Sequence, residues 1–189
     1  MDRLEETGQI YNTIIVLWSD YGWQFGEKLA FRKFTLWERA LRVPLMIAGP
    51  GVVKGESREP ISLLDLYPTL CHQSGATAKH PLAGEDLSPV LAGEQWQRRE
   101  PVISIWGKWE KDTPDGARVA FSLRNETHRY CFYWNGGEEL YESENDPFKH
   151  INLLAHSAFG GNLRTLADSF QAQIDRLVPE LAEVAGWIV

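Results

Sequence analysis

An uninterrupted apolar run near the start of the chain places the strongest constraint on its fold. Residues 13–20, TIIVLWSD, contain β-branched residues without polar alternation and end in a polar pair. Such a run predicts a strand that is buried on both faces, as in the middle of an α/β sheet. Functional residues in these sheets tend to follow the carboxyl end of a strand. The segment from Ser19 to Gly22 is therefore the first place to look for a site.

Two further apolar runs extend this pattern. Residues 43–51, VPLMIAGPG, predict a second buried strand that stops at the Gly-Pro-Gly sequence, and residues 101–107, PVISIWG, predict a third. So few strands cannot cover both faces of a buried sheet. We therefore expect this part of the chain to be the end of a larger sheet.

Helices are predicted around these strands. Residues 2–8 are expected to be the end of a polar helix closed by Gly8, residues 35–41 a short helix, and the SPVLAG sequence at 88–93 a turn of helix. Residues 61–75 have helical apolar spacing and end at a glycine. Pro68 lies inside this last run, so the helix should either kink there or begin late.

The pattern changes after residue 108. Residues 117–125 and 129–135 predict two strands of an antiparallel meander with one solvated face, and the Asn-Gly-Gly turn at 135–137 leads into another strand. Residues 162–185 show the clearest helical periodicity, although Pro179 falls within it.

These elements predict an α/β fold class, namely the C-terminal portion of a mixed-sheet α/β domain followed by a small antiparallel α+β subdomain with a C-terminal helix. The predicted domains are residues 1–107 and residues 108–189. The total of 189 residues suits one ordinary domain with an appendage.

Composition excludes some partners. The net charge is −7 and no basic block is present, so we expect no nucleic-acid binding, because phosphate contacts need clustered positive charge. No apolar run approaches the roughly 18 residues of a membrane span, and we expect no membrane association. The charged N-terminus lacks the apolar core of a signal peptide. As written the chain would be cytoplasmic, but its compartment stays open.

A longer pattern over residues 12–51 resembles the sulfatases of the alkaline-phosphatase superfamily. It consists of SDYG at 19–22, FGE at 25–27, Lys33, RVPL at 42–45 and GPG at 49–51. The order and spacing are similar to the family pattern over about forty residues. Similarity continues through 62–75, 82–94 and 129–154, and bacterial iduronate-sulfatase-like and choline-sulfatase-like members look most similar.

The resemblance implies a set of site residues. Sulfatases bind a divalent cation, usually calcium, which takes oxygen ligands. The resemblance places Asp20 among these ligands and Tyr21 at the family's Asn or His ligand position. A neutral phenol is a poor calcium ligand, so Tyr21 should weaken or remove the metal site. Lys33 matches the lysine that contacts the sulfate, where a point cation suits the charge that develops as the ester bond breaks.

Two parts of the family's chemistry are absent from these 189 residues. Neither Cys71 nor Cys131 lies in the Cys-x-Pro/Ala-x-Arg motif from which the formylglycine nucleophile forms, and no Asp-Asp metal pair is present. We therefore expect a sulfatase-like C-terminal fragment that does not hydrolyse sulfate esters alone. A superfamily phosphodiesterase or phosphonate hydrolase is a related alternative.

Three partner hypotheses stay open. A separate N-terminal sulfatase chain could complete the enzyme. The segment with Trp23, Arg32 and Lys33 could instead form a non-catalytic binding module for sulfated or anionic sugars. Exposed sheet edges and apolar faces also predict self-association.

Overall fold

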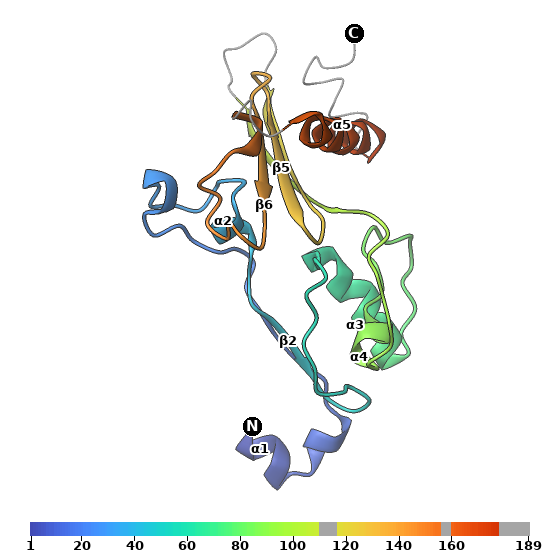
Figure 1. Ribbon diagram of the computed structural model, residues 1–189. Coiled ribbons are helices and arrows are strands. Elements are labelled where there is room, and N and C mark those ends of the chain that lie inside the picture. Colours follow the sequence, from blue (N-terminus) through green and yellow to red (C-terminus); the bar gives the residue numbers. More distant parts are fainter. Residues whose placement is uncertain (110–116, 156–159, 178–189) are drawn as a thin grey trace. The chain divides into compact units, whose positions relative to one another are not determined.

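The structure is a computed structural model that describes residues 1–109, 117–155 and 160–177 (Figure 1). The chain divides into two compact units. The first unit comprises Met1–Asp20 and Val43–Arg99, and the second comprises Tyr21–Arg42 and Glu100–Val189. The predicted division into residues 1–107 and 108–189 stays a prediction, although its boundary falls within strand β3 (Val102–Trp109).

The first unit contains a two-stranded antiparallel sheet of β1 (Ile15–Trp18) and β2 (Leu45–Ala48). Both runs were predicted as strands buried on both faces, and this is wrong for the described residues. The side chains of Leu17, Trp18 and Met46 are 54%, 51% and 58% exposed. The physical reason is that the described part of this sheet has only two strands, and two strands side by side leave the side chains on their faces open to solvent.

The first unit also contains short helices. They are α1 (Asp2–Glu6), η1 (Gln9–Asn12), η3 (Leu63–Asp65), α3 (Leu66–Ser74) and α4 (Ser88–Leu91). The expected effect of Pro68 is confirmed, because α3 begins late and leaves this proline in its first turn, where the missing N–H is not needed. Asp65 is fully buried, and its carboxylate accepts hydrogen bonds from Arg98 and from two backbone amides.

The second unit contains a four-stranded antiparallel meander. Its strands are β3, β4 (Ala117–Arg124), β5 (His128–Tyr133) and β6 (Glu138–Glu142), arranged in chain order. The predicted meander is confirmed. The expectation that residues 101–107 form a third strand beside the runs at 13–20 and 43–51 is wrong. This run pairs instead with β4 along its length, with Val102 opposite Arg124.

Both faces of this sheet are covered, which corrects the expectation that one face is solvated. Helix α5 (Gly160–Leu177) packs on one face (Figure 1). There Phe170 stacks on Tyr130, with 5.8 Å between the ring centroids. The buried residues of this first core are Val119, Phe121, Leu123, Tyr130, Leu140, Ala167, Phe170 and Ile174.

The opposite face of the sheet is covered by residues 21–42, which we call the site loop. Leu36 packs there against Ala120 and Cys131, and all three are buried. The described helix α5 begins two residues earlier than predicted and is seen as far as Leu177. The remaining part of that prediction, which includes Pro179, lies outside the described residues. The mixed α/β class with antiparallel sheets and a C-terminal helix is confirmed.

Candidate functional site

The site loop folds back on itself through backbone hydrogen bonds. The amide of Gly22 donates to the carbonyl of Ala40 at 2.8 Å, and the amide of Gln24 donates to the carbonyl of Arg32 at 3.1 Å. Near the tip lies the short 3-10 helix η2 (Glu27–Leu29), and the returning arm ends in α2 (Glu38–Leu41). This pairing brings residues that are well separated along the loop onto neighbouring positions.

Gly22 is required by a close backbone contact. A Cβ at this position would lie 2.1 Å from the carbonyl oxygen of Arg39 and 3.1 Å from that of Arg42. Backbone atoms cannot move aside as a flexible side-chain end can. The glycine that follows Tyr21 therefore allows the two arms of the site loop to approach each other.

Tyr21 and Lys33 meet across these arms. The ammonium nitrogen of Lys33 lies 3.5 Å from the ring centroid of Tyr21 and 5.2 Å from that of Phe34. Lys33 is half-buried, whereas Tyr21 is 41% exposed. A cation over an aromatic ring in such a setting contributes about 0.5–1 kcal/mol. The structure thus brings two of the three predicted site residues together.

Asp20 is the third predicted site residue and is exposed. It is the last residue of the first of the two segments that make up the first unit, whereas Tyr21 and Lys33 belong to the second unit. The roles of Asp20 and Tyr21 at a metal ion, and of Lys33 at sulfate, stay predictions.

The residues present do not fit a complete calcium site. Calcium takes about six to eight oxygen ligands, several of them carboxylates. Among the described residues, no group of three or more His, Cys, Asp or Glu side chains is placed to hold a metal ion. Asp20 offers one carboxylate. The Tyr21 ring lies against an ammonium group, which repels a divalent cation at the same place.

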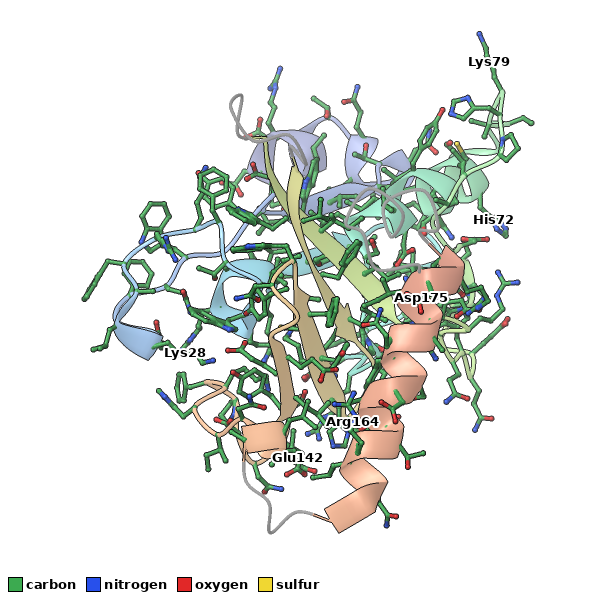
Figure 2. All side chains as sticks on the ribbon, turned by 90° about the horizontal axis from the view of Figure 1, so that it is seen from above. Lys28, His72, Lys79, Glu142, Arg164 and Asp175 are labelled. Carbon is green, nitrogen blue, oxygen red and sulfur yellow. The ribbon has the colours of Figure 1, made fainter. Side chains whose placement is uncertain are left out.

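The site loop is anchored to the sheet by Lys28, a contact that sequence reasoning missed. The Lys28 ammonium donates a hydrogen bond to the hydroxyl of Tyr141 and lies 3.6 Å from the carboxylate of Glu139. It also lies 4.2 Å from the Trp37 ring centroid and 4.3 Å from that of Tyr141. Burial lowers the pKa of Lys28, and the charge of Glu139 opposes that shift. Figure 2 shows Lys28 on the site loop.

Glu139 gathers further donors at this anchor. Its Oε2 accepts a hydrogen bond of 2.8 Å from the indole N–H of Trp37 and another of 2.8 Å from the hydroxyl of Tyr133. Each partner comes from a different part of the second unit. No local sequence pattern could have found this cluster, because its members are far apart along the chain.

A second ion pair fixes the base of the site loop. Arg129 is 4% exposed and donates to the Glu38 carboxylate at 3.0 Å, and Arg124 lies 3.7 Å from the same carboxylate. Burial raises the pKa of Glu38, but the two guanidinium groups outweigh it and hold that pKa below its ordinary value. The loop that carries Lys33 is therefore held to the sheet at both Lys28 and Glu38.

The described helices include none with the length and apolar character that crossing a membrane requires.

Comparison with known proteins identifies relatives of this chain. Residues 26–176 match the family model for the C-terminal region of N-sulphoglucosamine sulphohydrolase. A sulfatase of Formosa agariphila is 32% identical over 88% of this chain, and a choline-sulfatase of Rhizobium meliloti is 31% identical over 81%.

A solved structure agrees with these relatives. A 2-O GAG sulfatase superposes with a TM-score of 0.72 and 27% identity, and the match covers 88% of this chain and 37% of that protein. The match with the Formosa sulfatase covers 31% of its length, and that with the choline-sulfatase covers 29%. The chain thus spans about a third of the length of these relatives. By these matches the chain belongs to the sulfatase family of the alkaline-phosphatase superfamily, and it corresponds to the C-terminal region that the family model describes.

Proposed function

We propose that this chain forms the C-terminal part of a sulfuric ester hydrolase, and that it does not hydrolyse sulfate esters by itself. In this proposal Lys33 contacts the sulfate and Asp20 contributes one ligand to a calcium ion. The observation that carries it is the placement of Lys33 on a firmly anchored loop without a set of metal ligands beside it among the described residues. An ammonium group held on a rigid loop suits the charge that develops on a sulfate oxygen.

The cysteines support the second half of the proposal. Cys131 is fully buried against the carbonyl of Leu36, and burial raises the pKa of its thiol to about 12. A thiol with such a pKa stays protonated at neutral pH and is a poor nucleophile. Cys71 lies within α3 and outside the family's nucleophile motif.

The first test measures hydrolysis of 4-nitrocatechol sulfate by the purified chain, with calcium chloride and with EDTA. We expect no release of 4-nitrocatechol above the buffer rate in either condition. Calcium-dependent turnover that resists further purification would overturn the proposal that the chain is inactive alone.

A second test addresses Lys33 separately. Sulfate binding is followed by NMR titration with sodium sulfate for the wild type, for Lys33→Met and for Lys79→Met. Lys79 is an exposed lysine that projects away from the ribbon and serves as the matched control (Figure 2). We expect the Lys33 variant to bind sulfate several-fold more weakly, while the control is unchanged. Equal affinities in all three proteins would remove Lys33 from the site.

A complementing N-terminal polypeptide is a second candidate for how the chain functions. Two observations favour it. Apolar side chains of β1 and β2 are exposed, and the chain spans about a third of the length of its relatives. Co-expression with the preceding two thirds of the Formosa agariphila sulfatase tests it. Activity in the co-purified complex, and its loss in Lys33→Met, is the expected result. Two inactive proteins that never co-purify would speak against it.

A further inference from the structure

Tyr21 stands where the family pattern has a metal ligand, and in this structure its ring contacts the ammonium group of Lys33. The Tyr21 ring faces the ammonium group of Lys33 at 3.5 Å, which is within the range of a direct cation–π contact. Phe34 lies farther from the same ammonium, at 5.2 Å. The contact therefore belongs mainly to Tyr21.

The surroundings explain why this contact matters to a lysine in particular. The Lys33 side chain is a flexible stem of four carbons, and ordering such a stem costs rotamer entropy. The backbone on either side is already held, because the Gln24 amide bonds the Arg32 carbonyl and the Gly22 amide bonds the Ala40 carbonyl. The Lys33 side chain then remains to be ordered, and the face of the Tyr21 ring against its ammonium group restricts its motion.

We propose that Tyr21 is a positioning residue that holds the Lys33 ammonium by the face of its ring, and that it acts through Lys33 rather than as a metal ligand. The inference rests on the proposed function of Lys33 at sulfate. A ring covers one side of the ammonium and leaves other N–H donors available to an anion. Pre-ordering the lysine in this way reduces the entropy lost when sulfate binds.

The contact itself is tested by NMR on the full chain, without any ligand. The ε-methylene protons of Lys33, assigned by their absence in Lys33→Met, should be shifted upfield by the ring current of Tyr21 and show cross-relaxation with its ring protons. Tyr21→Phe keeps the ring and should keep the upfield shift. Tyr21→Leu should move these signals downfield, toward the position of exposed lysines, with only the more distant Phe34 ring left beside them. Because Tyr21 is 41% exposed, both variants should fold, and far-ultraviolet circular dichroism checks this.

Two NMR outcomes would overturn the inference. One is an unchanged Lys33 signal in Tyr21→Leu, because the ring would then not be against the ammonium. The other is an equal loss in Tyr21→Phe, because the hydroxyl and not the ring face would then hold the lysine. Wild-type cross-relaxation between the two side chains gives a readout that needs no variant.

Sulfate titration then tests the consequence. We expect Tyr21→Leu to weaken sulfate binding by about two- to fivefold, the range that corresponds to an exposed cation–π contact, and Tyr21→Phe to bind like the wild type. Tighter binding by Tyr21→Leu would mean that the ring blocks Lys33, and it would overturn the positioning role. If Lys33→Met binds sulfate as well as the wild type, the proposed function fails, and the ring-current shift still reports on the contact independently.

Discussion

At the scale of single residues, three lysines of the second unit show how surroundings set the role of one side chain. Lys33 lies over an exposed ring, and Lys28 joins the site loop to the sheet. Lys149 is fully buried and donates to the carbonyls of Glu142 at 3.1 Å and Asp146 at 2.9 Å. Burial lowers the pKa of Lys149 to about 8.

The lowered pKa of Lys149 predicts a pH-dependent contribution to stability. Between about pH 8 and 10.5 the unfolded chain binds more protons than the folded one at this group, so its contribution to stability rises with pH. The free energy of unfolding of the wild type, relative to Lys149→Met, should increase by about 2 kcal/mol from pH 7 to pH 9.5. Urea denaturation at both pH values measures it, with Lys79→Met as the control. A difference that does not change with pH would contradict the prediction.

At the scale of elements, the site loop and α5 are both held to the meander by charged groups. Arg164 of α5 donates two hydrogen bonds, of 2.6 and 2.8 Å, to the Glu138 carboxylate of β6. The Arg164 hydrogen bond is the main cause that holds the pKa of Glu138 below its ordinary value. The site loop uses Lys28 against Glu139, the next residue of β6. Adjacent side chains of one strand thus secure both covering elements.

Removing the charge of Lys28 should loosen the site loop. In Lys28→Met the apolar stem is kept, but the hydrogen bond to Tyr141 and the attraction to Glu139 are lost. We expect a loss of about 1–3 kcal/mol in the free energy of unfolding, because the partly buried Glu139 carboxylate keeps fewer partners. Urea denaturation measures this, and a double-mutant cycle with Glu139→Gln isolates the pair. A coupling energy near zero would show that the anchor does not depend on this pair.

The docking of α5 should depend on its apolar face. Phe170 is 2% exposed and stacks on Tyr130, so Phe170→Ala removes a ring from the first core. We expect it to lower the free energy of unfolding by about 3–5 kcal/mol. Thr165→Ala on the exposed side of the same helix is the matched control and should change it little. Similar losses of unfolding free energy in both variants would show that α5 is not docked through the face that carries Phe170.

At the scale of the whole molecule, both strands of the first unit expose large apolar side chains. Trp18 and Met46 are about half exposed on β1 and β2, whereas the meander has a covering element on each face. Exposed apolar surface beside unpaired strand edges favours association with another polypeptide. The relatives are about three times as long as the stretch that matches this chain, which fits such an unfinished surface.

This surface predicts concentration-dependent association of the purified chain. Light scattering should show a mean mass that rises with protein concentration. Trp18→Lys places a charge on the exposed strand and should reduce that rise, whereas Tyr67→Lys, at a comparably exposed position on α3, should not. A constant monomer mass for the wild type over the whole concentration range would contradict the prediction.

The sequence by itself determined the elements and the family. Strand and helix positions follow from local apolar spacing and from Gly and Pro. The late start of α3 at Leu66, which leaves Pro68 in the first turn, is an example, and these signals need no distant partner. The family follows from an ordered series of short motifs that includes SDYG and Lys33.

Only the tertiary structure decided which strands share a sheet and what surrounds the site residues. Residues 101–107 pair with β4 and so belong to the meander, not to the sheet of β1 and β2. The site loop covers the face of the meander that the sequence predicted to be solvated. The contacts of Lys28 with Glu139 and of Tyr21 with Lys33 depend on chain segments that meet only after folding. Pairing and burial are set by long-range packing, and local residue patterns carry little information about it.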